Sequence, residues 1–158
     1  MPGTRPSVTQ ASADPALPRG CSNLKLRQAD RVVSRHYDHH LASVGLKTSQ
    51  YALLGHIAAL GPVRPAELAA AMALDASTLT RNLQPLVAQG WALVGAGDDA
   101  RSRSVQLTDA GRAKHAEAKR AWKKAQLAFN ERLGEARVAQ LHALLDDCLR
   151  VMADDAAG

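Results

Sequence analysis

The sequence predicts a mainly α-helical fold with one small β-hairpin. Ala and Leu dominate a chain that is 46% hydrophobic and only 3% aromatic, a composition that favours helix over sheet. Apolar residues recur at steps of three and four over long stretches, whereas strict alternation marks two short segments, residues 91–94 and 104–107. The chain has 158 residues, enough for one domain with its own core and an extension.

The order of elements in the centre of the chain is informative. Residues 65–72 form an apolar segment that begins with proline, a residue favoured in the first helical turn. After a tight turn, residues 76–89 form a second helical segment that ends at Gly90. The two alternating segments then enclose a charged, turn-forming loop. Helix, turn, helix and a hairpin with arginines at its tip is the layout of a winged helix-turn-helix, which we expect over residues 46–108.

Two faces can be assigned to the paired helices. Asp75 should cap the second helix by accepting hydrogen bonds from the backbone amides of Ser77 or Thr78. Pro85 removes one backbone hydrogen bond, so we expect a bend near residues 81–84. The residues expected to face inward are Leu68, Ala69, Met72, Leu79, Leu83, Leu86 and Val87. The polar residues expected to face outward are Ser77, Thr78, Thr80, Arg81 and Gln84.

The N-terminal part precedes this domain. Residues 1–20 carry four prolines among small and polar residues and predict a flexible tail. Residues 23–43 predict a long helix that Gly45 closes, with one apolar face made by Leu26, Ala29, Val33, Tyr37 and Leu41. Residues 48–60 predict a helix capped by Thr48 or Ser49, with its apolar face made by Leu53, Leu54, Ile57 and Leu60. Val63 and Arg64 can add a short third strand to the hairpin.

Two helices follow the hairpin. Thr108 caps a predicted helix over residues 109–133, which is rich in basic residues, and Gly134 ends it. The last predicted helix covers residues 135–153. Its apolar residues recur at alternating steps of three and four, which is the spacing of a helix–helix seam. These residues are Val138, Leu141, Leu145, Cys148 and Met152. We expect residues 21–45 and 109–158 to form a helical dimerisation region.

Composition excludes several classes of function. The formal net charge of +5 is compatible with a polyanionic partner but does not require one. The two cysteines, Cys21 and Cys148, lack metal-ligand spacing and are expected to be free thiols. The sequence shows no Gly-rich phosphate loop, metal-ligand set or nucleophile with a nearby base, so we expect neither an enzyme nor a cofactor. It also shows no membrane-length apolar run and no signal-peptide core, so a cytoplasmic location is expected.

At this point the residues resemble the MarR family of bacterial transcriptional regulators, over roughly residues 24–152. The most specific match is Asp99-x-Arg101-x-Arg103, followed by Val105-Gln-Leu107-Thr108-x-x-Gly111, which is similar to the family's wing signature. The other matches are Gly45-Leu46, Gln50-Tyr51-x-Leu53-Leu54 and Leu79-Thr80-Arg81-Asn82-Leu83. Two departures are Lys47, where many members have a capping Thr, and Ala100, where many have a further basic residue.

The resemblance implies a homodimer in which the terminal helices form the interface and each subunit brings one winged helix to DNA. Members typically repress genes and release DNA when a small phenolic or aromatic ligand binds, or when a cysteine is oxidised. The candidate DNA contacts are Arg64, Ser77, Thr78, Thr80, Arg81, Gln84, Arg101 and Arg103. Within them, Arg81 can pair with guanine and Gln84 with adenine. Arg101 is expected to contact DNA and Asp99 to brace the wing by pairing with Arg103, although the opposite assignment of the arginines stays open.

Three further groups are candidates for a signal. Tyr37, Tyr51, His56 and Trp122 lie on helices that line the ligand crevice in similar proteins, although each can equally serve packing or a dimer contact. Cys21 lies near the position of a peroxide-sensing cysteine in some members, but the tyrosines that usually surround such a thiol are missing. His36 and His40 share a helix face, but no third ligand completes a metal site, and we expect none.

Two functions therefore remain: a homodimeric regulator that binds a pseudo-palindromic operator, and a winged-helix protein-interaction module without an operator. The regulator would respond to a small aromatic ligand, or to oxidation of Cys21. The formal charges of residues 64–103 cancel, so any positive DNA-binding surface there must be created by folding.

Overall fold

The computed structural model describes residues 19–97 and 102–155, and it confirms the predicted fold class. The elements are α1 (Ser22–Leu41), a 3₁₀ turn η1 (Ala42–Val44), α2 (Thr48–Leu60), α3 (Pro65–Ala71), α4 (Ala76–Ala88), β1 (Ala92–Ala96), β2 (Arg103–Leu107), α5 (Asp109–Leu133) and α6 (Glu135–Asp155). No helix of the described residues has both the length and the apolar character needed to cross a membrane.

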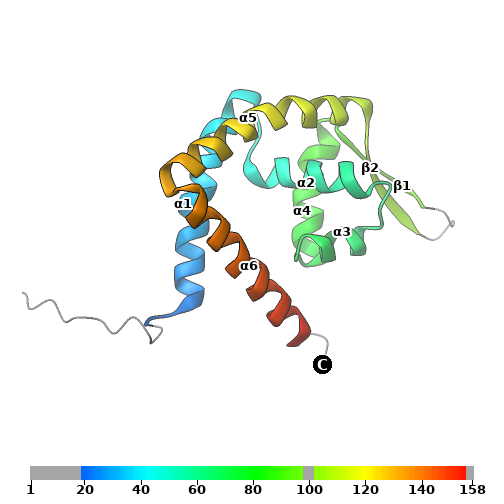
Figure 1. Ribbon diagram of the computed structural model, residues 1–158. Coiled ribbons are helices and arrows are strands. Elements are labelled where there is room, and N and C mark those ends of the chain that lie inside the picture. Colours follow the sequence, from blue (N-terminus) through cyan, green and yellow to red (C-terminus); the bar gives the residue numbers. More distant parts are fainter. Residues whose placement is uncertain (1–18, 98–101, 156–158) are drawn as a thin grey trace, which may run out of the picture.

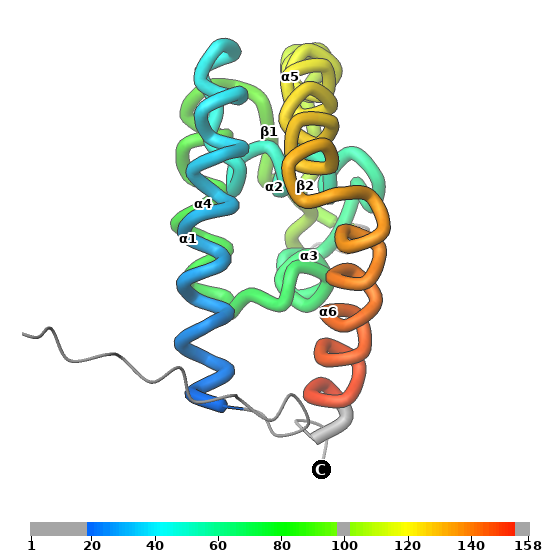
Figure 2. The backbone as a smooth tube through the Cα atoms, turned by 60° about the vertical axis from the view of Figure 1, so that its left-hand side comes forward, coloured from blue at the N-terminus to red at the C-terminus, as the bar shows by residue number. Residues whose placement is uncertain are grey.

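The helices are arranged in two parts that α5 connects. Figure 1 shows α2, α3, α4 and the hairpin on one side, while α1 and α6 extend from the other end of α5. In Figure 2, α1 and α6 both descend from the α5 end of the molecule toward the same side. The helix that follows the hairpin therefore fixes the distance between the winged domain and the terminal helices.

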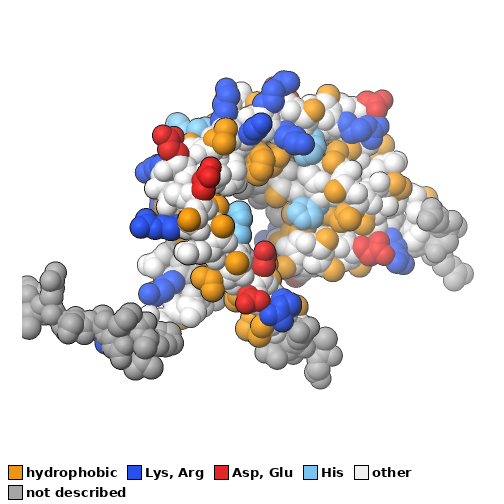
Figure 3. All heavy atoms as spheres, in the orientation of Figure 1, with side chains coloured by type: hydrophobic (Ala, Val, Ile, Leu, Met, Phe, Trp, Pro, Cys, Tyr) orange, Lys and Arg blue, Asp and Glu red, His pale blue; other side chains and the backbone are white. Residues whose placement is uncertain are grey.

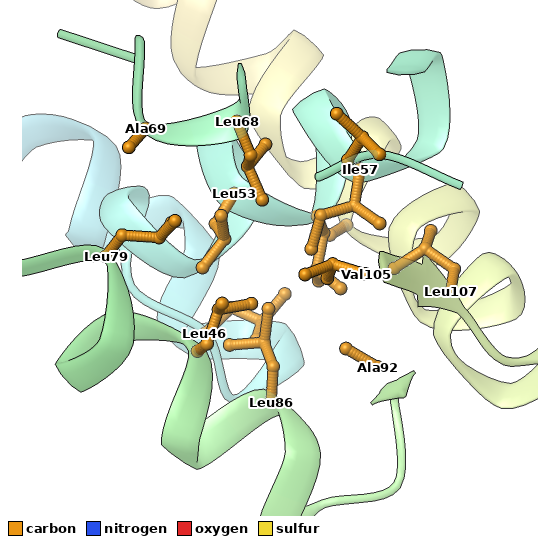
Figure 4. Close-up of a cluster of buried hydrophobic side chains, with 14 of the residues drawn as sticks. Leu46, Leu53, Ile57, Leu68, Ala69, Leu79, Leu86, Ala92, Val105 and Leu107 are labelled. Atoms are coloured by element: carbon orange, nitrogen blue, oxygen red, sulfur yellow. The ribbon is translucent and has the colours of Figure 1, made fainter. Parts of the chain in front are cut away.

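The winged domain has a core built from every one of its elements. Leu53, Leu54 and Ile57 of α2 are buried against Leu68 of α3 and against β2, where Val105 has no exposed surface. Figure 4 shows Leu53, Ile57, Leu68 and Val105 pointing toward one another, together with Leu46, Leu79, Leu86, Ala92 and Leu107. A close-packed apolar core of this kind holds α4 and the hairpin in a fixed relative position.

The hairpin is antiparallel, with Ala92 opposite Leu107 and Ala96 opposite Arg103. Val63 adds one bridge beside β2: its amide donates to the Val105 carbonyl at 3.0 Å, and its own carbonyl accepts from the Val105 amide at 2.8 Å. The predicted third strand is therefore a single residue pair. It ties the segment before α3 to the sheet.

Local capping follows the sequence predictions in two cases and differs in a third. Oδ1 of Asp75 accepts from the amide of Thr78 at 2.8 Å, and Oγ1 of Thr108 accepts from the amide of Gly111 at 2.9 Å, as predicted. The prediction for α2 was wrong, because its N-cap is Lys47 and not Thr48 or Ser49. Thr48 is already the first residue of the helix, and its hydroxyl donates to Oδ1 of Asp38 at 2.7 Å.

Several apolar residues expected to be inside are exposed in the single chain. Leu60 is 46% exposed and Val87 is 41% exposed, because each lies just beyond the edge of its helix's buried stripe. Cys148, expected on the apolar seam of α6, is also exposed. In the expected dimerisation helices, Leu26 is 46% and Met152 is 62% exposed. α4 is a single continuous helix through Pro85.

Candidate nucleic-acid interface

α4 presents a polar face to solvent. Leu79, Leu83 and Leu86 are buried on one side of the helix, whereas the residues exposed on the other are Ser77, Thr80, Arg81 and Gln84. Thr78 is half-buried. The helical period that places three leucines in the core thus places the predicted base-reading residues outside. Nothing in the core covers Arg81 or Gln84, so both can reach a groove of DNA.

The first turn of α4 is closed by a network around Asp75. Its carboxylate accepts from the hydroxyls of Ser77 and Thr78, each at 2.7 Å, as well as from the Thr78 amide. These donors hold the pKa of Asp75 well below its ordinary value. Each hydroxyl has one proton, and both protons are given to Asp75, so neither hydroxyl can donate to a phosphate without breaking this network.

The hydroxyl proton of Thr80, the next residue on this face, is also already engaged within the protein. The Thr80 hydroxyl donates to the carbonyl of Ala76 at 2.9 Å. Arg81 donates through Nη2 to Oγ1 of Thr78 at 3.2 Å, and its remaining guanidinium donors face outward from an exposed side chain. Of the residues predicted on α4, Arg81 and Gln84 are therefore the best placed to donate hydrogen bonds to DNA.

Arg64 lies at the N-cap of α3 and is engaged by an acidic neighbour. It forms an exposed ion pair with Glu67, and the hydrogen bond from its guanidinium lowers the pKa of the Glu67 carboxyl. A phosphate would have to compete with this carboxylate for Arg64. Arg64 is thus within the candidate surface, but its charge is already balanced locally.

The hairpin completes the surface beside α4. A groove of about 700 Å³ runs between them, and its lining includes Thr80, Gln84 and Val87 from α4 with Val94 and Arg103 from the hairpin. Folding thereby brings Arg103 to the same groove as two predicted DNA contacts. The two valines were not predicted as part of this surface, and Val87 was expected to face inward. Val94 is exposed although it lies two residues from the buried Ala92, because β1 is buried at Ala92 alone. Asp99 and Arg101 lie outside the described residues, so their assigned roles stay predictions.

The four residues proposed to line an effector site do not all come together. Tyr51 stacks between two rings of α5, with its ring centroid 5.9 Å from Trp122 and 5.6 Å from His115. Burial raises the pKa of Tyr51 and lowers that of His115. His115 was missed by the sequence analysis, although it lies seven residues before Trp122 and so on the same face of α5.

Tyr37 and His56 lie elsewhere. The Tyr37 hydroxyl donates to Oε1 of Gln126 at 2.6 Å, and its ring lies beside Phe129. Nδ1 of His56 is 2.8 Å from the carbonyl of Ala52 within α2. The structure therefore pairs Tyr51 with Trp122 at the junction of α2 and α5, and places Tyr37 at the junction of α1 and α5.

The cysteine and histidine candidates can be placed as well. Cys21 is the exposed N-cap of α1 and carries a free thiol. Nε2 of His36 lies 2.8 Å from the carbonyl of Ala125, so this ring links α1 to α5. Its ring centroid is 5.1 Å from that of His40. In the ranges 19–97 and 102–155, no three His, Cys, Asp or Glu residues are grouped to hold a metal.

Comparison with known proteins agrees with this geometry. The sequence model of the MarR family matches residues 44–102, which include most of the winged domain. The crystal structure of the Mycobacterium tuberculosis transcriptional regulator MosR in complex with DNA is 30% identical, with a TM-score of 0.67. That similarity covers 82% of this chain and 98% of MosR. The chain belongs to the MarR family.

Two other similar proteins are also transcriptional regulators. The transcriptional repressor CouR, bound to a 23-mer DNA duplex, is 25% identical with a TM-score of 0.74, over 81% of this chain and 92% of CouR. An uncharacterised HTH-type regulator of Bacillus subtilis, YwoH, is 28% identical over 93 residues, 59% of this chain and 68% of the relative. As a MarR-family member, the chain is a DNA-binding transcriptional regulator, a class of proteins that are not enzymes.

Proposed function

We propose that this chain acts as a homodimer that binds a pseudo-palindromic operator and represses transcription until a signal releases it. The observation that carries the proposal is the exposed pair Arg81 and Gln84 on a helix fixed beside the hairpin, with Arg103 on the same groove. Two such helices in a dimer would read two half-sites about one helical turn of DNA apart. A regulator of chromosomal genes would act in the cytoplasm.

Support for the dimer comes from the terminal helices. Leu24, Leu26 and Val32 on α1 are exposed. On α6, the exposed apolar residues include Leu144, Leu149, Val151 and Met152. Large apolar residues repeated along two helices that extend away from the core fit an interface with a second copy. Support for repression comes from the similar protein CouR, a transcriptional repressor whose structure is bound to DNA.

The proposed signal is a small phenolic or aromatic ligand acting at the junction of α2 and α5. Tyr51, Trp122 and His115 form an aromatic cluster there, between the winged domain and the helix that leads to the terminal helices. A ligand that separates or replaces these rings would change the distance between the two recognition helices. Thermal unfolding with a panel of salicylate-type compounds tests this; no shift with any compound would count against the cluster as the site.

Oxidation of Cys21 is the alternative signal. Its thiol is exposed at the start of α1, a helix expected at the dimer interface. Treatment with peroxide would then weaken DNA binding by the wild type and leave the Cys21→Ser variant unaffected. Equal loss of binding in both proteins would exclude this thiol as the sensor.

The central experiment is selection of bound sequences from a pool of random DNA duplexes. An inverted repeat with half-sites about one helical turn apart is expected. Arg81→Ala should weaken binding to the selected duplex by roughly 1–3 kcal/mol, because it removes a base contact in each half-site. Arg27→Ala, an equal change of charge on α1, should footprint like the wild type. If no sequence is enriched, the chain is a winged-helix interaction module and the proposal is wrong.

A further inference from the structure

The positive charge of the chain lies mostly on α5. This helix contains seven Lys and Arg residues against three Asp and Glu, a formal charge of +4. Residues 46–108, which include α4 and the hairpin, contain five basic against four acidic residues. The part of the chain that reads DNA is therefore nearly neutral, while the helix behind it carries most of the chain's formal charge of +5.

Four of these charges form one surface, the α5 basic face, made by Lys119, Arg120, Lys123 and Lys124. All four side chains are exposed, and their spacing of one, three and one residues puts them on one side of the helix. Figure 3 shows Lys and Arg side chains gathered along the upper edge of the molecule over α5.

The ion pairs that α5 forms within the described residues leave out the α5 basic face. The ion pairs of α5 are Arg112 with Asp109 and Lys114 with Glu117, and in the described part of the chain none of the four residues of the face has an ion pair. Lys119 and Lys123 are four residues apart, as are Arg120 and Lys124, so like charges repel along both rows. A polyanion would relieve this repulsion.

The basic surface continues onto α1. A hollow of about 470 Å³ separates α5 from the end of α1, and His39, His40 and Ser43 border it opposite Arg120 and Lys124. Glu117 is the acidic residue on its rim. Neighbouring positive charges, among them Lys124, contribute to the lowered pKa of His40, after burial as the main cause. The potential around the hollow therefore favours an anion.

The α5 basic face is on the opposite side of the winged domain from α3 and from the start of α4, which follows α3 after residues 72–75. α2 packs against α5 and also against α3 and α4, and Figure 1 shows α5 along the upper edge, α3 along the lower edge and α2 between them. Three helix layers span roughly 25–30 Å from outer surface to outer surface. A straight duplex bound along the α3 edge, at the start of α4, would therefore not touch Lys119 or Lys123.

Resting on the proposed function, we propose that the α5 basic face binds the phosphates of a second DNA segment, without sequence preference, while α4 holds the operator. Unpaired Lys and Arg residues without base-reading geometry fit phosphates. A membrane surface fits less well, because Ala121 is buried and Trp122 is half-buried against Tyr51, which leaves no apolar side chain between the basic residues to enter lipid. One dimer would thereby join two stretches of duplex.

The test is a bridging experiment with the full chain. Operator duplex of the selected sequence is immobilised and saturated with protein, and a labelled duplex of scrambled sequence is then added. The wild type should retain the labelled duplex at about 50 mM salt and release it by about 200 mM. The quadruple variant with Lys119, Arg120, Lys123 and Lys124 each changed to Gln should still saturate the operator but retain at least tenfold less labelled duplex.

The matched control changes Lys25, Arg27, Arg31 and Arg137 to Gln, which removes the same charge from other exposed positions. It should bridge like the wild type. Circular dichroism should show that the quadruple α5 variant melts no lower than the wild type, because the substitution removes two like-charge pairs. Equal bridging by wild type and α5 variant, or equal loss in the control, overturns the inference. So does tighter binding of the wild type to anionic-lipid vesicles than to duplex.

The two proposals can fail separately. Arg81→Ala should lose the preference for the selected sequence while still binding scrambled duplex through the α5 basic face. If no sequence is ever selected but the α5 variant loses binding to scrambled duplex, the operator proposal fails and this inference stands. If a sequence is selected and the α5 variant bridges normally, the operator proposal stands and this inference fails.

Discussion

Asp38 of α1 caps α2 by accepting two hydrogen bonds from Thr48. Its Oδ1 accepts from the backbone amide and from the hydroxyl of Thr48, each at 2.7 Å. The cap thus comes from the preceding helix, ten residues earlier in the chain. Because α1 is an expected dimerisation helix and α2 belongs to the winged domain, this contact helps to set the angle between them.

Asp38→Ala should therefore lower the free energy of unfolding by about 1–2 kcal/mol, the usual cost of losing a helix cap that is partly buried. Urea denaturation measures it. Asp30→Ala is the control, since Asp30 accepts from the Ser34 hydroxyl of its own helix in an exposed hydrogen bond. Equal unfolding midpoints for the two variants would show that the contact between the helices contributes nothing.

Gly111 is required by a close approach of two backbones. A Cβ atom at this position would lie 1.9 Å from the carbonyl oxygen of Trp91, and neither the first turn of α5 nor the start of the hairpin can yield easily. Gly111→Ala should destabilise the protein by about 3 kcal/mol, at the upper end of overpacking effects.

Gly95→Ala is the comparison for that variant, because a Cβ there meets nothing within 4 Å. It should unfold at nearly the wild-type temperature. A thermal midpoint for Gly111→Ala equal to that of Gly95→Ala would mean that the approach of Trp91 to α5 is looser than described.

His115 should make the stability of the protein sensitive to mild acid. Burial, and then Lys119, lower the pKa of His115. The unfolded chain takes up this proton near pH 6.5, at about the ordinary value, whereas the folded chain takes it up at a lower pH. Since the unfolded state binds more protons in that window, stability is complete above about pH 7 and decreases as the pH falls toward 5.

Urea unfolding midpoints measured from about pH 7.5 to about pH 5 test this loss of stability. The range is chosen because it spans the ordinary histidine pKa. His115→Phe should reduce the decrease, because it keeps an aromatic ring beside Tyr51 without a titrating group. His142→Gln, on the exposed surface of α6, should leave the decrease unchanged. The idea is wrong if His115→Phe follows the wild-type curve throughout.

The exposed leucines of α6 should control the oligomeric state. Leu144 is 70% and Leu149 is 62% exposed in the single chain, so the double change to Glu should not disturb the fold. It should convert the proposed dimer to a monomer, because two charges would be buried in an apolar interface. Sedimentation velocity measures the change, and Leu93→Glu, on the hairpin, is the control that should stay dimeric.

Much of the fold could be predicted because its signals are local. The 3.6-residue period of Leu79, Leu83 and Leu86 specifies which side of α4 is buried, and the caps Asp75 and Thr108 act within three residues of their own position. The wing and helix motifs identified the family for the same reason, since they are short and continuous in sequence. These interactions depend on neighbours along the chain, which the sequence displays directly.

Only the tertiary structure decided which side chains form contacts between helices and which partners they contact. The sequence contains Asp38, Thr48, Tyr51, His115 and Trp122 but not their contacts, because these join residues of different helices up to 71 positions apart. It also cannot show that α5 and α3, the helix that precedes α4, lie on opposite sides of α2. That separation arises from three-dimensional packing of the buried faces, and it turns a weakly basic composition into two distinct surfaces.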